Sequence, residues 1–81
     1  MTRTLILYTR AGCPLCEEMA AAAEGLLAGH AVGIATVDVD ADPVLKARYG
    51  WDVPLLFDGG TELGRHRLDP AAIRAWLAAQ A

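Results

Sequence analysis

Cys13 and Cys16 are the two cysteines of the 81-residue chain, and they stand in the segment Gly12-Cys13-Pro14-Leu15-Cys16. An apolar run precedes this segment, and a stretch with helical periodicity follows it. At the first turn of a helix, this spacing places two sulfur atoms on neighbouring positions of one face, within reach of disulfide geometry. The sequence therefore predicts a dithiol that is oxidised and reduced.

The place of Cys13 at a helix N-terminus predicts a reactive thiol. Unpaired backbone N–H groups and the partial positive charge of a helix end stabilise a thiolate. Such sites lower a thiol pKa from about 8.5 to roughly 3.5 to 7.5. Cys16 falls on the inward face of the expected helix. We therefore expect Cys13 to be the nucleophile and Cys16 to be the more buried, resolving thiol.

Metal binding is the main alternative chemistry for the cysteine pair. Two thiolates alone rarely complete a zinc site, and neither His30 nor His66 stands at a ligand-like spacing from them. We therefore expect no bound metal and no bound cofactor. Reduced glutathione or a reductase would then be the electron donor that returns the pair to its dithiol form.

Length and composition limit the classes of protein to which the chain can belong. Residues 1–81 suffice for a single domain with one core. The net charge of −3 and the scattered basic residues disfavour nucleic acid as a partner. No apolar run approaches the roughly 18 residues that span a bilayer, so we expect a cytoplasmic protein with no membrane partner. We also expect a monomer. Thiols stay reduced in the cytoplasm, which favours a catalytic, redox-sensing or metal-binding pair over a structural disulfide.

The elements that must position the cysteines follow from periodicity and from the proline and glycine positions. Strands are expected over residues 4–9, 34–39, 53–57 and 61–63, with a hairpin turn at 58–60. Helices are expected over residues 15–28, 43–50 and from residue 70 onward, the last two starting at Asp-Pro pairs. The order β-α-β-α-β-β-α predicts an α/β fold, in which a four-stranded mixed sheet has helices on both faces.

On these motifs the chain resembles the glutaredoxin-like proteins of the thioredoxin superfamily, and most closely their short bacterial members. The segment 13–16 is similar to the C-P-Y-C active site of dithiol glutaredoxins, and Tyr49-Gly50 is similar to the segment before the active-site proline of thioredoxins. Val53-Pro54 is similar to the pair whose proline is cis and faces the active site. The resemblance covers essentially the whole chain and implies a thioredoxin-like fold.

The resemblance implies a thiol–disulfide oxidoreductase, with Cys13 and Cys16 as catalytic residues and a protein or small-molecule disulfide as substrate. A noncatalytic thioredoxin-fold module that holds a protein partner or a metal or iron–sulfur centre is the alternative. Arg10 stands where many glutaredoxins have a basic residue, so it is either a solvated loop charge or a group that stabilises the thiolate and receives a substrate carboxylate. The expected substrate-binding residues are Arg10, Pro14, Leu15, Val53, Pro54, Arg65 and Arg67.

The segment after the last expected strand departs from glutaredoxins. Glutaredoxins hold the glutamyl end of glutathione there with a Gly-Gly pair closely followed by Asp, whereas this chain has Gly64-Arg65-His66-Arg67-Leu68-Asp69. The basic triplet 65–67 is either a solvated strand end or an anion site in place of the glycines. We expect weak turnover of glutathione mixed disulfides, and a protein disulfide or another anionic thiol compound as the better substrate. Trp51 either caps the preceding helix or forms a partly exposed contact surface near the cysteines.

Overall fold

A four-stranded mixed sheet forms the centre of the molecule in the computed structural model, which describes residues 3–80. The strands follow the order β2-β1-β3-β4. β1 pairs in parallel with β2 and antiparallel with β3, and β3 and β4 form an antiparallel hairpin. The chain order β-α-β-α-β-β-α is confirmed. The strands are β1 (Arg3–Thr9), β2 (Val32–Asp38), β3 (Leu55–Asp58) and β4 (Thr61–Arg65).

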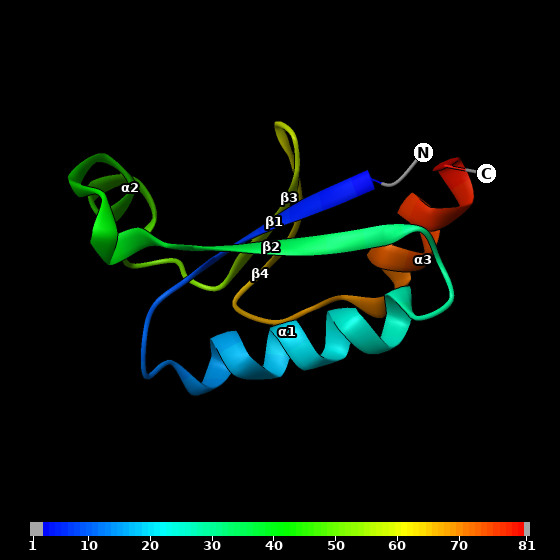
Figure 1. The fold of residues 1–81 in the computed structure, drawn as a ribbon, viewed down its shortest axis with the longest axis horizontal. Coiled ribbons are helices and arrows are strands. Elements are labelled where there is room, and N and C mark those ends of the chain that lie inside the picture. The colour runs from blue at the N-terminus through cyan, green and yellow to red at the C-terminus, as the bar shows by residue number, and fades with distance from the viewer. Residues whose placement is uncertain (1–2, 81) are drawn as a thin grey trace.

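Helices α1 (Pro14–Leu27) and α3 (Pro70–Gln80) lie together on one side of the sheet, and α2 (Pro43–Tyr49) lies at the end of the sheet where β2 finishes (Figure 1). The Tyr49 ring of α2 stacks on Tyr8 of β1, with 4.7 Å between ring centroids. Tyr8 follows the buried Leu7 along the strand, so it points to the face opposite α1 and α3. Through this aromatic contact, α2 packs on the face of the sheet opposite α1 and α3.

The core lies between the sheet and the α1–α3 pair. Alternate residues of β1 face this layer, which is why Leu5 and Leu7 are both buried while Ile6 and Tyr8 are half-buried. Helix α1 contributes residues spaced three or four apart, as its amphipathic pattern predicts. Trp76 of α3 is also buried here, as expected for a core residue. The buried cluster comprises Leu5, Leu7, Met19, Ala23, Leu27, Leu56, Leu63, Ile73 and Trp76.

Helices α2 and α3 begin at the two Asp-Pro pairs. Asp42 accepts a hydrogen bond from the backbone N–H of Val44 at 2.8 Å, and Asp69 accepts one from that of Ala71 at 3.0 Å. Each carboxylate therefore satisfies a backbone donor that the first helical turn leaves unpaired. These local contacts explain why both helix starts could be predicted.

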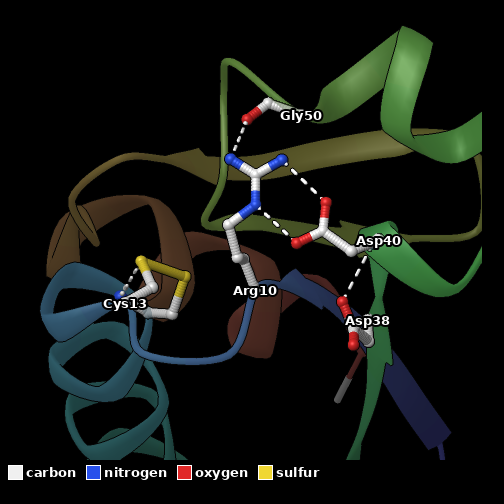
Figure 2. Close-up of polar contacts among 6 residues, drawn as sticks. Arg10, Cys13, Asp38, Asp40 and Gly50 are labelled. Atoms are coloured by element: carbon white, nitrogen blue, oxygen red, sulfur yellow. Dashed lines mark hydrogen bonds and ion pairs between the residues drawn. A yellow bond between two sulfur atoms is a disulfide. The ribbon is translucent and has the colours of Figure 1, made fainter.

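The structure corrects the predicted end of the second strand. Val39 was expected in the strand, but it begins a short 3-10 helix, η1 (Val39–Ala41). The Asp38 carboxylate accepts a hydrogen bond from the Asp40 N–H at 2.9 Å, which turns the backbone out of the sheet while the Val39 side chain remains fully buried. The turn places Asp40 beside the loop that precedes α1 (Figure 2).

Helices long and apolar enough to cross a bilayer are absent from residues 3–80.

Candidate active site

The cysteine pair lies where the loop after β1 enters α1. Pro14 is the first residue of the helix, and Cys13 is its N-cap, with φ −102° and ψ 105°. The two sulfur atoms form a disulfide across a Cα–Cα distance of 5.2 Å (Figure 2). The Cys13 Sγ also accepts a hydrogen bond from the Cys16 backbone N–H at 3.2 Å. A thiolate at this position would therefore gain both a donor and the positive end of the helix dipole.

The two sulfur positions differ in exposure. Cys16 is only 5% exposed and belongs to the buried face of α1, whereas Cys13 is half-buried at the helix tip. Pro14 and Leu15, which separate them, are both exposed. The geometry thus leaves one cysteine partly accessible at the helix tip and keeps the other buried within one helical turn of it.

The Val53–Pro54 peptide bond is cis, as the resemblance implied. Pro54 is buried, and its carbonyl accepts a hydrogen bond from the His66 backbone N–H at 2.8 Å. The bond lies just before β3, so Val53 and Pro54 belong to the loop and not to the strand that the sequence predicted. The segment 65–67 is held against this loop by the same hydrogen bond.

Arg10 is bound within the protein. Its guanidinium donates to both Asp40 carboxylate oxygens, at 2.8 and 2.9 Å, and to the Gly50 carbonyl at 2.9 Å (Figure 2). The hydrogen bond from Arg10 lowers the pKa of the Asp40 carboxyl, and the same contact raises the pKa of Arg10. This fork ties the loop that carries Cys13 to η1 and to the end of α2, so much of the Arg10 charge is balanced before any substrate arrives.

Arg65 is also paired. It contacts Glu62 at 2.8 Å and Asp52 at 3.2 Å, and its hydrogen bond lowers the pKa of Glu62. His66 lies 3.8 Å from the same Asp52 carboxylate, in a left-handed backbone conformation with φ 63°. Asp52 therefore holds the basic triplet beside the cis-proline loop.

Arg67 lies at a groove between the first turns of α1 and the segment after β4. Leu15 and Met19 line one side of this open groove of about 360 Å³, and His66, Arg67 and Leu68 line the other. Among residues 3–80, Arg67 has no carboxylate within ion-pair distance. Of the three predicted substrate-binding arginines, it is the one whose charge remains available, although Glu18 also lines the groove.

Asp40, Gly50 and Asp52 were not predicted as parts of the site. They lie 30, 40 and 13 residues along the chain from the arginines that they bind. No periodicity or short motif joins residues at such separations. Of the three residues, only Gly50 had a sequence signal, because it was expected to end the helix over residues 43–50.

The fold and the cysteine pair together define a thioredoxin-fold protein with a C-x-x-C site. Residues 4–78 match the model of the family described as Glutaredoxin-like domain. The chain therefore belongs to the glutaredoxin-like family of the thioredoxin superfamily. Comparison with curated protein sequences finds no significant match.

Solved structures of two bacterial proteins are similar to this chain in both sequence and fold. The X-ray structure of target protein XcR50 from X. campestris is 38% identical with a TM-score of 0.70, and the match covers 93% of this chain and 96% of that one. The solution structure of protein Ne2328 from Nitrosomonas europaea is 33% identical with a TM-score of 0.81, covering 94% and 92%. Thioredoxin 1 from Thermosipho africanus, at 17% identity, a TM-score of 0.62 and 95% and 97% coverage, shares the fold.

Proposed function

We propose that the protein is a thiol–disulfide oxidoreductase in which Cys13 is the nucleophile and Cys16 is the resolving thiol. The observation that carries the proposal is the N-cap position of Cys13, whose sulfur accepts the Cys16 N–H at 3.2 Å. A donor and a helix dipole aimed at one sulfur favour its thiolate, which is the nucleophilic form. Burial of the second sulfur suits a thiol that reacts only within the protein.

The reaction transfers two electrons from the protein to the substrate. The Cys13 thiolate attacks one sulfur of the substrate disulfide, and a mixed disulfide forms while the other substrate sulfur leaves as a thiolate that takes a proton from water. The Cys16 thiolate, after losing its proton to solvent, then attacks the Cys13 sulfur. The Cys13–Cys16 disulfide forms, and the second substrate thiol is released. Two equivalents of reduced glutathione, or one reductase dithiol, return the pair to its reduced form.

The substrate side of the proposal favours disulfides larger or more anionic than those of glutathione. The segment from Gly64 to Asp69 makes a tight turn through His66 and contributes Arg67 to a groove beside Leu15. This arrangement differs from the two glycines and nearby Asp that hold glutathione in glutaredoxins. The proposal includes a reducing, cytoplasmic environment, because the dithiol must be reduced before it can donate electrons. It also includes a monomeric state.

Reduction of insulin by dithiothreitol, followed as turbidity, tests the reaction. We expect wild-type protein at micromolar concentration to accelerate it, and Cys13→Ser to return the rate to that of dithiothreitol alone. Cys16→Ser is the matched control, because it keeps the nucleophile and should accumulate a mixed disulfide detectable by mass spectrometry. Wild-type protein that fails to accelerate the reaction, or that retains bound zinc or a coloured centre after purification, would favour the noncatalytic binding module.

A further inference from the structure

Trp51 is the most exposed large apolar side chain among the described residues. It is 94% exposed, whereas Val44 is 69% and Leu15 is 40% exposed. The other tryptophan, Trp76, is buried and donates its indole N–H to Asp58 at 2.9 Å. A tryptophan is the side chain that gains most from burial, so one that its own fold leaves almost fully exposed is available to another molecule.

The loop holds Trp51 in this position from its N-terminal side. The Gly50 carbonyl accepts the Arg10 guanidinium at 2.9 Å, and the Gly50 N–H donates to the Lys46 carbonyl at 2.9 Å (Figure 2). Gly50 is buried, and a Cβ there would meet the Lys46 carbonyl oxygen and lie 3.1 Å from the Arg10 Nη2. The backbone directly before Trp51 is therefore fixed.

The C-terminal side of the loop is held as well. The Asp52 N–H donates to the Tyr49 carbonyl at 2.9 Å, which closes a turn with Gly50 and Trp51 at its corner. The Asp52 carboxylate binds Arg65 at 3.2 Å. Trp51 is thus exposed on a loop anchored on both sides, and a ligand does not have to order the loop before it binds.

The same contacts link the loop that carries Trp51 to the reactive site. Arg10, which holds Gly50, stands three residues before Cys13, and the Val53–Pro54 pair begins two residues after Trp51. Leu15, the second exposed apolar side chain of this region, lies between the two cysteines. Exposed apolar side chains therefore lie on both parts of the site, Leu15 in the first turn of α1 and Trp51 in the loop that leads to the cis-proline bond.

We propose that Trp51 determines specificity for polypeptide disulfides, by packing on an apolar side chain beside the substrate cysteine. This inference rests on the proposed function. A ligand that reaches both Cys13 and Trp51 must bridge two loops, which suits an extended peptide that pairs along the cis-proline loop. Glutathione carries no apolar side chain, so it leaves Trp51 in water.

Two synthetic peptides of equal length test the proposal. Each carries one cysteine in a mixed disulfide with 2-mercaptoethanol, flanked on both sides by Leu in one peptide and by Ser in the other. For wild-type protein we expect kcat/KM to be about tenfold higher for the Leu peptide, mainly through KM. In Trp51→Ala the ratio should fall close to one, and Trp51→Phe should restore most of it. Val44→Ala, another exposed apolar position, is the matched control and should keep the wild-type ratio.

The outcomes separate this inference from the proposed function. A wild-type protein that reduces both peptides with a ratio near one overturns the role of Trp51 and leaves the oxidoreductase standing. An equal fall of kcat/KM for both peptides in Trp51→Ala also overturns it, because that result describes a general effect on the site. A wild-type protein that reduces neither peptide nor insulin overturns the proposed function, and the specificity inference with it.

Discussion

The two cysteines of the candidate active site have different environments. Cys13 caps α1 and is half-buried, whereas Cys16 is 5% exposed on the packed face of the helix. The N–H of Cys16 points at the sulfur of Cys13, so one cysteine provides part of the surroundings that activate the other. The difference in accessibility supports the order of attack in the proposed mechanism.

We predict that the reduced protein reacts with iodoacetamide at Cys13 at least about tenfold faster than at Cys16, because the outer sulfur is both accessible and stabilised as a thiolate. Mass spectrometry of peptides after short labelling times measures the two rates. The single variants Cys16→Ser and Cys13→Ser are the controls, since each leaves one thiol. Faster labelling of Cys13→Ser than of Cys16→Ser would reverse the roles assigned to the two cysteines.

At the scale of elements, the site is joined by side chains that cross between loops. Arg10 connects the loop before α1 with η1 and with the end of α2, and Arg65 connects β4 with the cis-proline loop. The close approach at Gly50 makes the first connection possible, because this position has no room for a side chain. Glycine is therefore required at Gly50 by packing and not by a left-handed backbone, since its φ is −56°.

We predict opposite effects for two glycine substitutions. Gly50→Ala should destabilise the protein by about 1–3 kcal/mol, because its Cβ would overlap the Lys46 carbonyl oxygen. Gly25→Ala, at an exposed position in α1 with open space around the new Cβ, should stabilise it by about 0.5–1 kcal/mol. Urea unfolding followed by circular dichroism measures both. Unchanged stability of Gly50→Ala would show that the end of α2 adjusts without cost.

At the scale of the whole molecule, Asp58 joins the first strand, the hairpin and the last helix. It accepts hydrogen bonds from Arg3 at 2.7 Å and from Trp76 at 2.9 Å, and its side chain is 15% exposed. The start of β1 and the end of α3 accordingly lie at the same end of the molecule (Figure 1). The hydrogen bond from Arg3, followed by that from Trp76, lowers the pKa of the Asp58 carboxyl below its usual 3.8.

We predict that protonation of the Asp58 carboxylate accounts for part of the stability that the protein loses at acid pH. A pKa lower in the folded than in the unfolded state adds stability above the unfolded pKa of about 3.9, and this stability is lost as the pH falls through the folded pKa. Asp58→Asn should therefore lower Tm at pH 7, and its Tm should approach that of wild-type protein near pH 2. Thermal unfolding between pH 7 and 2 measures this, with Glu24→Gln, at an exposed position of α1, as the control. Parallel curves for wild type and Asp58→Asn would contradict the prediction.

The sequence by itself determined the features that depend on neighbouring residues. The disulfide reach of the cysteine pair, the helix starts at Asp42-Pro43 and Asp69-Pro70, and the order of strands and helices were all predicted and are confirmed. Each rests on contacts within a few residues or on the repeat of one element, which a linear pattern records. The cis bond at Val53–Pro54 is also confirmed, although it was implied by the family resemblance and not by the residues alone.

Only the tertiary structure decided how the charges and the large side chains around the cysteines are used. Arg10 was considered for a substrate carboxylate, but the fold brings Asp40 and Gly50 to it from 30 and 40 residues away. Val39 leaves the expected strand because Asp38 caps a turn, which puts Asp40 in reach. The exposure of Trp51 likewise depends on the anchors of its loop. Pairings between distant segments depend on how the sheet and helices pack, and no local pattern along the chain specifies them.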